Sequence, residues 1–294
     1  MNIAIVGGTP LAAAIAARLV SSSSVKVFRD RARPGTTVVA SLVQLAQVAD
    51  VVILALDSGA EVHDALFSAE GLLVGLTAGR TVIDQTPGDP EATRANAAEL
   101  RQRGIDLIDA PLHCELLEAL PETAAIMCGG PESVATALRP LLESICPKVV
   151  YFGETGSGQA ARLVIGAIAA CNRLVTYEAS AMGYRNGLSV DDMATVLNRC
   201  SGANSATARV LPALAAGGRT ADSALGGVVE ELRLASLLGT RLGAPMIVAN
   251  LVHGLLMAAA SGLTASATLD DTARVFLPGL GAAASTSDAP VAAL

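Results

Sequence analysis

Short apolar runs alternate with Ala-rich segments through the first half of the chain. The runs cover residues 2–6, 25–28, 51–56, 81–84 and 106–109. Helix-like stretches such as 10–20 and 90–103 lie between them. Uninterrupted apolar runs of this length are typical of buried parallel strands. Alternation of strand and helix implies right-handed crossovers, so the pattern predicts an α/β fold with a doubly wound sheet, which the runs 124–130 and 148–153 extend.

The pattern changes after Gly158, where the periodicity becomes helical and stays so to about Phe276. The first helix, over about 159–186, would be about 40 Å long, and Asn186-Gly187 marks its end. With 294 residues the chain is long enough for more than one domain. We expect a Rossmann domain over 1–158, an all-helical domain over 159–280 and a frayed tail over 281–294.

The composition argues against a nucleic-acid or anionic-membrane surface. The net charge is −7, and the chain has no Trp and few other aromatic residues. Its five cysteines are scattered without a CxxC pair, so we expect free thiols, no metal site and a reducing compartment. The chain opens directly as a strand without a basic leader, and the cytoplasm is the expected location.

An uncharged stretch over 242–269 resembles a membrane span in length. Pro245, Gly254 and Gly262 interrupt it, and much of its hydropathy comes from Ala. A buried helix at a large apolar interface is therefore the preferred interpretation over a membrane span.

The first strand runs into Gly7-Gly8-Thr9-Pro10-Leu11-Ala12 and then a helix. Gly7 permits the tight turn, Pro10 suits the first helical position, and the helix N-terminus, with Leu11, offers N–H groups to a pyrophosphate. The Cβ of Thr9 limits the approach of the phosphates, although its hydroxyl could donate a hydrogen bond. The turn predicts a dinucleotide site, and a plain strand-turn-helix is the alternative.

The end of the second strand decides which dinucleotide fits. NAD enzymes normally place a carboxylate there, whereas this chain has Arg29, followed by Arg31 and Arg33. Planar guanidinium donors suit a 2′-phosphate. The cluster therefore favours NADP, with a solvated charged loop as the alternative.

Several segments in order resemble the β-hydroxyacid dehydrogenase family, to which imine reductases are related. They are VVILALDSGAEV, TVIDQTPGDPEATR, DLIDAPLHCELLEALPETAAIMCGG, GETGSGQAARLV and GGVVEELRLA. The resemblance implies an NAD(P)-dependent oxidoreductase acting on a small molecule. It also implies that Leu56 and Thr86 line the nicotinamide-ribose side and that the protein is a homodimer with interlocked helical domains.

The chain departs from the family's substrate loop. Where the family usually reads Ser-Gly-Gly, this sequence reads His113-Cys114-Glu115, so a small hydroxy-carboxylate should bind poorly. Cys114 and Glu115 are expected to contact a substrate of different shape. His113 could donate a proton near neutral pH, and a structural, hydrogen-bonded His is the alternative.

The position of the family's general acid/base Lys falls on Arg162, and that of an Asn one turn on falls on Gly166. Gly166 is therefore expected at the substrate. Arg stays protonated, so Arg162 can bind an anion or stabilise negative charge but cannot readily shuttle a proton. The only lysines, Lys26 and Lys148, are not plausibly placed to replace it.

A Lys-Asp pair that the family has near the nicotinamide is Glu230-Glu231 here. We expect Glu230 near the cofactor and an acidic site that favours a cationic iminium substrate. Imine reductases often use an Asp or Tyr in place of the Lys. The nearest candidate on the same helix, Tyr177, lies about 22 Å along it and would have to act from a partner subunit.

Three interpretations remain open. The preferred one is an NADPH-dependent reductase of a small imine or carbonyl. The second is an NADP-dependent β-hydroxyacid dehydrogenase in which Arg162 anchors a carboxylate and His113 supplies the acid/base function. The third is a cofactor-binding homologue without catalysis.

Overall fold

The computed structural model describes residues 1–28, 33–117, 124–264 and 266–277. The chain divides into two compact units, of which the first comprises Met1–Ala167 and Gly227–Asn250 and the second Ile168–Gly226 and the chain from Leu251 on. The domain bounds expected from the sequence, 1–158 and 159–280, stay predictions. The tail over 281–294 lies outside the described residues.

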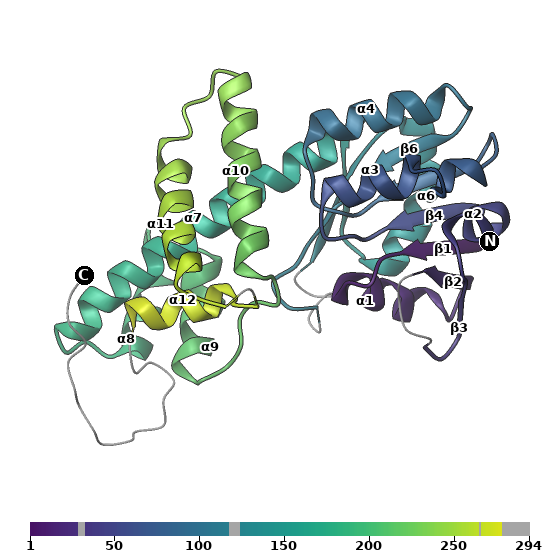
Figure 1. Cartoon of the computed structure of the whole chain (residues 1–294). Helices are drawn as coiled ribbons and strands as arrows, with labels where there is room; N and C mark the ends of the chain where they lie inside the picture. Colours follow the sequence, from purple (N-terminus) through teal and green to yellow (C-terminus); the bar gives the residue numbers. More distant parts are fainter. Residues whose placement is uncertain (29–32, 118–123, 265, 278–294) are drawn as a thin grey trace. The chain divides into compact units, whose positions relative to one another are not determined.

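The first unit holds the sheet (Figure 1). Its strands are β1 (Asn2–Val6), β2 (Ser24–Phe28), β3 (Thr36–Val38), β4 (Val51–Leu54), β5 (Thr81–Asp84), β6 (Asp106–Asp109), β7 (Leu112–His113), β8 (Ala125–Gly129) and β9 (Val149–Gly153). Their order among the described residues is β3-β2-β1-β4-β5-β6-β8-β7, with β9 beside β8. Strands β1 to β6 pair in parallel, and β8 runs antiparallel to β6 and β7. The predicted doubly wound α/β fold is confirmed.

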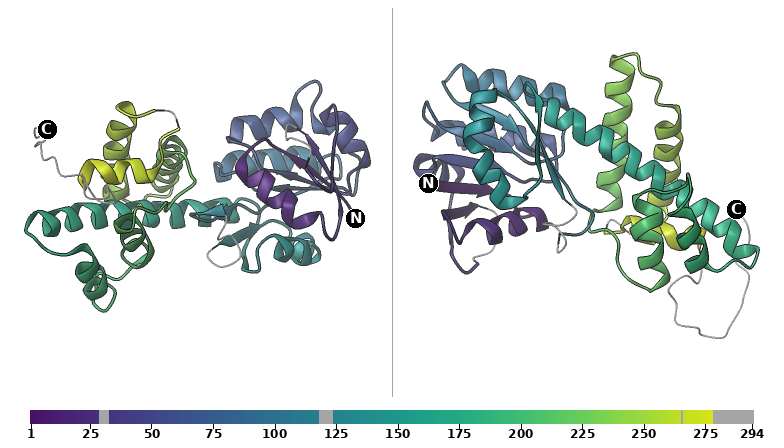
Figure 2. Two further views of the ribbon diagram at one scale, coloured as in Figure 1. Left: turned by 90° about the horizontal axis from the view of Figure 1, so that it is seen from below. Right: turned by 180° about the vertical axis from the view of Figure 1, so that it is seen from behind.

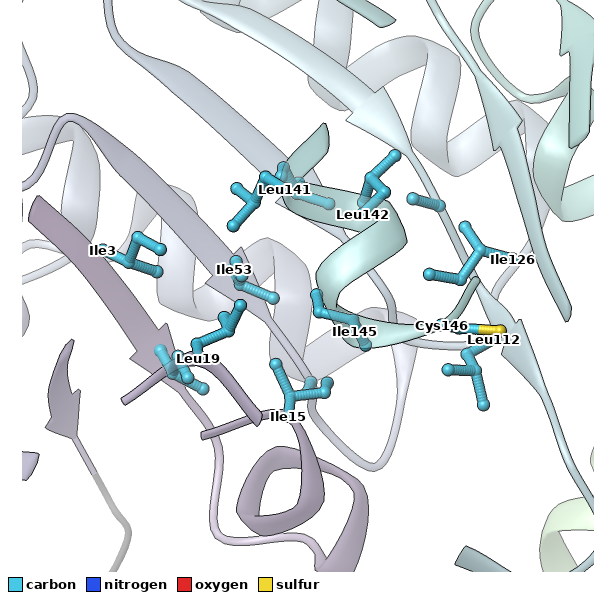
Figure 3. Packing of buried hydrophobic residues seen from close by; sticks show 14 of the residues in the cluster. Ile3, Ile15, Leu19, Ile53, Leu112, Ile126, Leu141, Leu142, Ile145 and Cys146 are labelled. Carbon is cyan, nitrogen blue, oxygen red and sulfur yellow. The ribbon is translucent and has the colours of Figure 1, made fainter. Parts of the chain in front are cut away.

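Helices cover both faces of this sheet (Figure 2). Helices α1 (Pro10–Leu19) and α6 (Glu132–Ile145) pack on one face, where Ile15 and Leu142 meet Ile53 of β4 (Figure 3). The other face is covered by α2 (Leu42–Val48), α3 (Gly59–Phe67), η1 (Leu72–Val74) and α4 (Pro90–Arg101). Successive residues of each central strand thus point alternately into the hydrophobic cores on the two faces of the sheet. Because both faces are buried, the strands are apolar throughout.

Two strands were not predicted from the sequence. Strand β3 has the sequence TTV and lies at the partly exposed edge of the sheet. Strand β7 has only two residues, directly after Pro111. Neither forms an apolar run, so the hydrophobic pattern carries no signal for them.

The remaining elements are helical. Helix α7 (Ser157–Arg185) begins in the first unit and continues into the second. The others are α8 (Val190–Leu197), the π-turn η3 (Ala206–Val210), α9 (Leu211–Ala215), α10 (Leu225–Arg241), α11 (Ile247–Ser261) and α12 (Leu269–Phe276). Gly187, with φ of +83°, follows the end of α7 as expected. Beyond β9 no strand occurs in the described part of the chain, only an isolated bridge between Ala224 and Thr268.

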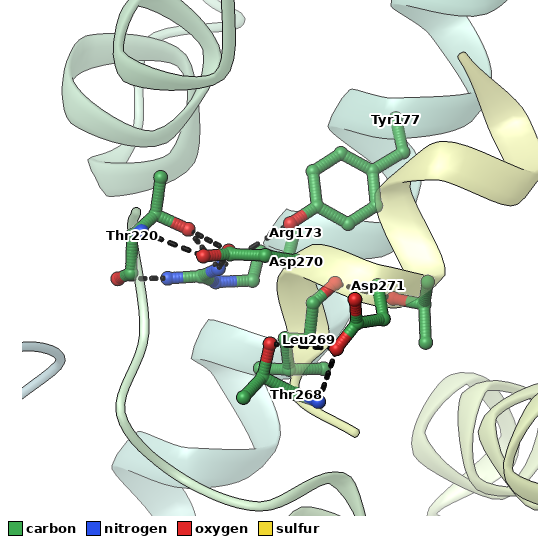
Figure 4. A network of polar contacts seen from close by, with 8 residues as sticks. Arg173, Tyr177, Thr220, Thr268, Leu269, Asp270 and Asp271 are labelled. Atoms are coloured by element: carbon green, nitrogen blue, oxygen red, sulfur yellow. Dashed lines mark hydrogen bonds and ion pairs between the residues drawn. The ribbon is translucent and has the colours of Figure 1, made fainter. Parts of the chain in front are cut away.

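Within the second unit, a buried polar network links helix α7 with helix α12 (Figure 4). Arg173 donates to the hydroxyl of Thr220 at 2.7 Å and forms an ion pair with Asp270 at 3.3 Å. It also donates to the hydroxyl of Tyr177, whose ring is fully buried beside Phe276. Tyr177 is thus part of this unit's core, and its hydroxyl is engaged within the chain.

Among the described residues, α7 is the one helix long and apolar enough to cross a membrane, and 39% of its apolar window is buried. By length and composition, a core helix of a soluble protein meets the same criterion. The uncharged stretch over 242–269 contains α11, whose 15 residues fall short of the roughly 20 that a span requires.

Candidate functional site at the carboxyl edge of the sheet

The turn between β1 and α1 requires glycine at its first position. Gly7 has φ of +149°, and its N–H donates to the Phe28 carbonyl at 3.1 Å. A Cβ here would overlap the Ala55 carbonyl oxygen and lie 2.9 Å from its carbon. The backbones of β1 and of the segment after β4 therefore approach more closely at this turn than any side chain allows.

Thr9 caps α1 and has no hydroxyl proton to offer a phosphate. Its side chain accepts the Ala12 N–H at 3.0 Å and donates to the Ala55 carbonyl at 2.9 Å. The expected hydroxyl donor is therefore used within the turn. Pro10 occupies the first helical position as predicted, and Leu11 is half-buried against the core beneath α1. In the first turn Pro10 has no N–H, and Thr9 accepts the N–H groups of Ala12 and Ala13. The Leu11 N–H and the dipole of the helix N-terminus are what this turn can offer a pyrophosphate.

Leu56 and Thr86, which are predicted to line the nicotinamide-ribose side, meet just after the ends of neighbouring strands. The Leu56 N–H donates to the Thr86 hydroxyl at 3.0 Å, and both residues are buried. The Thr86 N–H in turn donates to Asp84 Oδ1 at 3.0 Å. Burial raises the pKa of Asp84 to about 7, although these contacts with Thr86 oppose the shift.

Gln159 is a positioning residue that the sequence analysis missed. Its side-chain amide donates to the Thr86 carbonyl at 2.7 Å and accepts the Gly88 N–H at 3.0 Å. One fully buried side chain on α7 therefore holds the loop after β5. Its only signal in the sequence is a polar residue in the first turn of a helix that begins with small and apolar residues.

Asp109, at the end of β6, anchors the beginning of α7. Its carboxylate accepts the N–H of Gly156 at 2.7 Å and of Gln159 at 2.8 Å. A carboxylate at a helix N-terminus is stabilised by the free N–H groups and the helix dipole. Burial nevertheless raises the pKa of Asp109. The anchor determines where Arg162, in the second turn of α7, is placed.

Arg162 forms a buried ion pair with Glu231 of α10. The two side chains are each 10% exposed. A Cβ on Gly166, one turn after Arg162, would overlap Glu231 Oε1 and lie 2.6 Å from its carboxyl carbon. The residues at positions 162, 166 and 231 are therefore sterically coupled. Glu231 fills the volume that a side chain at position 166 would need.

This pairing corrects the expected electrostatics of the site. The carboxylate of Glu231 is compensated by the guanidinium, so it does not add a net negative charge. Burial raises the pKa of Glu231, and the neighbouring Arg162 opposes that shift. Glu230, predicted near the cofactor, is exposed and bonded to Arg233 at 2.6 Å. The acid that pairs with Arg162 is thus Glu231, the residue directly after Glu230.

The residues predicted to contact the substrate lie at the end of β7. His113 is the last residue of this strand, Cys114 and Glu115 follow it, and all three are half-buried. Burial raises the pKa of the Cys114 thiol to about 11, while the nearby Arg162 lowers it. The thiol therefore stays protonated at neutral pH. All five cysteines are free, as predicted.

Arg29 and Arg31, predicted to bind a 2′-phosphate, lie outside the described residues, and Arg33 is exposed after β2. The described site thus combines the turn between β1 and α1, the buried Thr86 and an Arg162 whose charge is compensated by Glu231. Such a site can hold a dinucleotide and orient a polar group, but Arg162 cannot exchange a proton.

Comparison with known proteins agrees with this arrangement. The family model described as the NAD binding domain of 6-phosphogluconate dehydrogenase matches residues 8–153. A second model, NAD-binding of NADP-dependent 3-hydroxyisobutyrate dehydrogenase, matches residues 156–276. Mitochondrial 3-hydroxyisobutyrate dehydrogenase of Homo sapiens is 30% identical over 235 residues, which cover 78% of this chain and 69% of the human protein.

Solved structures share the whole fold. The chain is similar to Psf3 in complex with NADP+ and 2-OPP, with a TM-score of 0.81 and 24% identity over 93% of this chain and 99% of that one. An imine reductase from Myxococcus stipitatus in complex with NADP+ has a TM-score of 0.61 and 17% identity, covering 94% of this chain and 100% of that one. The chain belongs to the β-hydroxyacid dehydrogenase family of NAD(P)-dependent oxidoreductases.

Proposed function

We propose that this protein is an NADPH-dependent reductase that transfers a hydride to a small imine or carbonyl substrate. The observation that carries the proposal is the buried pair of Arg162 and Glu231. Oxidation of a hydroxyacid requires a base that removes the hydroxyl proton, and a guanidinium stays protonated. Reduction of a carbonyl or imine does not require such a base. A fixed hydrogen-bond donor can polarise the C=O or C=N group that accepts the hydride.

The cofactor would supply the hydride when bound. The first turn of α1 would hold its pyrophosphate, and Leu56 and Thr86 would line its nicotinamide-ribose side. Arg29, Arg31 and Arg33 would favour the 2′-phosphate of NADPH. The NADP-dependent description of the second family model and the NADP+ complexes among the structural neighbours support this preference.

The proton would come from the end of β7, from the residues that follow it or from water. His113, the last residue of β7, carries an imidazole, a group that can donate a proton in catalysis. The Cys114 thiol, with its pKa raised to about 11, serves as a hydrogen-bond donor at neutral pH. Glu115 completes the loop that would contact the substrate.

A second candidate is an NADP-dependent β-hydroxyacid dehydrogenase, favoured by the names of the curated relatives. In that reaction Arg162 would anchor a substrate carboxylate, and His113 would accept the hydroxyl proton. Nη1 of the guanidinium already donates to Glu231, which weakens such an anchor. This candidate therefore ranks second.

The test is a calorimetric titration with NADPH and NADH, followed by turnover assays with cyclic imines, ketones and hydroxyacids. We expect tighter binding of NADPH and its oxidation by an imine or carbonyl. Hydroxyacid-dependent reduction of NADP+ that is lost in Arg162→Ala would establish the second candidate instead. Cofactor binding without any turnover would indicate a non-catalytic homologue, and binding of neither cofactor would refute both enzymatic proposals.

We further propose a cytoplasmic homodimer. Large apolar side chains of α11 are exposed in the single chain, among them Ile247, Val248, Leu251 and Met257. An uncharged helix with such a face is stabilised when a second copy covers it. Sizing chromatography at micromolar concentration should give a dimer, and a monomer would contradict this proposal.

A further inference from the structure

Gly166 controls whether Glu231 can reach Arg162. The three residues lie within the first unit, with Arg162 and Gly166 one turn apart on α7 and Glu231 on α10. A Cβ at position 166 would overlap Glu231 Oε1 and lie 3.0 Å from Arg162 Nη1. Because the overlapping atom is the end of a flexible side chain, an Ala at position 166 displaces the carboxylate rather than the helix.

The charge of Arg162 is compensated, but its hydrogen-bonding capacity is not fully used. One guanidinium nitrogen, Nη1, bonds Glu231. Nε is buried and makes no hydrogen bond within the described part of the chain. A buried donor without an acceptor is costly, so a polar group of a ligand or a water molecule is expected beside it.

We propose that Gly166 and Glu231 together set the charge preference of the substrate site. Gly166 leaves room for the Glu231 carboxylate, Glu231 neutralises Arg162, and the site then selects an uncharged carbonyl or imine acceptor over a carboxylate. Displacing or neutralising Glu231 uncovers the guanidinium and turns the same site into a carboxylate-binding site. This inference rests on the proposed function, because it names the substrate class of the same site.

Two non-reducible probes of nearly equal shape test the charge preference without turnover. Isobutyrate carries a carboxylate, and isobutyramide replaces it by a neutral amide. Apparent dissociation constants of both would be measured by thermal shift on the full chain, with and without NADPH, at constant ionic strength. The measured quantity is the ratio of the two constants.

We expect the unmodified chain to bind isobutyrate no more tightly than isobutyramide. Gly166→Ala and Glu231→Gln should each shift the ratio at least tenfold toward isobutyrate. The double variant Arg162→Gln with Glu231→Gln should abolish the shift. Gly166→Ala keeps the fold even if Glu231→Gln does not, because Ala is the better helix former and only a side-chain end must move.

Matched controls separate this effect from general changes. Gly59→Ala adds a methyl group at a helical position with no atom within 4 Å. Glu143→Gln removes the acid of an exposed pair with Arg139 on α6. Both should keep the original ratio.

An unchanged ratio in both Gly166→Ala and Glu231→Gln would overturn the proposal. A tenfold preference of the unmodified chain for isobutyrate would overturn it as well. The proposed reductase activity fails separately, through the turnover panel. A shifted ratio with no turnover therefore supports the charge inference alone, and turnover with an unshifted ratio supports the reductase alone.

Discussion

The carboxylate of Asp109 accepts the backbone N–H of Gln159 at 2.8 Å, so the last residue of β6 anchors the helix that carries Arg162. Its other oxygen accepts the Gly156 N–H at 2.7 Å. Glycines at 129 and 158 make this contact possible, because a Cβ at either position would press against the same carboxylate. One buried side chain of the sheet thereby anchors the beginning of α7, the helix that carries Arg162.

Asp109→Asn should destabilise the protein by about 1–3 kcal/mol, because the amide can accept only one of these two N–H groups and must turn its NH2 toward the other. Chemical denaturation would measure the loss. Asp106→Asn, at the other end of β6, is the matched control and should change the free energy of unfolding by less than about 0.5 kcal/mol. Equal effects of the two variants would show that Asp109 does not anchor α7.

The buried carboxyl of Asp84 makes stability depend on pH. Its pKa is raised from 3.8 to about 7, so between these values the folded protein retains a proton that the unfolded chain has lost. The contribution of this group is full below about pH 4 and is lost as the pH rises through 7. Asp84→Asn should remove this pH-dependent contribution to the free energy of unfolding. The variant should be more stable than the unmodified chain at pH 8, by about 1–4 kcal/mol.

Unfolding of Asp84→Asn and of the unmodified chain at pH 5 and pH 8 would measure this difference. The Asn side-chain oxygen can still accept the Thr86 N–H, so the local hydrogen bond is retained. Burial also raises the pKa of Asp109, and the Asp109 charge contributes to the raised pKa of Asp84, so the difference between the two proteins includes this interaction. A variant with the same pH dependence as the unmodified chain would show that Asp84 is ionised in the fold.

Gly7→Ala should abolish cofactor binding and lower stability by more than about 2 kcal/mol, since it combines a positive φ with overlap of the Ala55 carbonyl. Gly79→Ala isolates the effect of the positive φ, because Gly79 has φ of +82° and a Cβ there would meet no atom within 4 Å. That control should lose only about 1 kcal/mol and keep the affinity for NADPH. Calorimetry and thermal unfolding on both variants would settle the comparison, and NADPH binding by Gly7→Ala would contradict the assigned role of the turn.

Asp270→Ala should destabilise the second unit strongly. It leaves the buried charge of Arg173 uncompensated and frees the Thr220 N–H, which now bonds Asp270 at 2.7 Å. Removing one member of a buried pair typically costs about 3–5 kcal/mol. Asp222→Ala, which breaks a more exposed pair with Arg219, should cost less than about 1 kcal/mol. Comparable losses in thermal unfolding would contradict the role of this network.

Local pattern predicted much of the fold and part of the site. Each central strand is an apolar run because both faces of the sheet are covered. The β1 turn is identifiable because Gly7 adopts a conformation that other residues cannot, and because proline is favoured at the first helical position, which Pro10 occupies. Leu56 and Thr86 follow neighbouring parallel strands, so strand order alone brings them together. Strands β3 and β7 were missed because they are held by edge pairing rather than by a hydrophobic pattern.

The sequence by itself therefore determined the strand-helix order and the glycine turn after β1. It also predicts that Arg162 stands where the family has a proton-exchanging Lys. Tertiary structure alone decided which acid neutralises that arginine. Glu230 and Glu231 are adjacent and chemically identical, but successive helical residues point about 100° apart, so only Glu231 faces Arg162. Contacts between residues 69 positions apart depend on how α7 and α10 pack, which no local periodicity encodes.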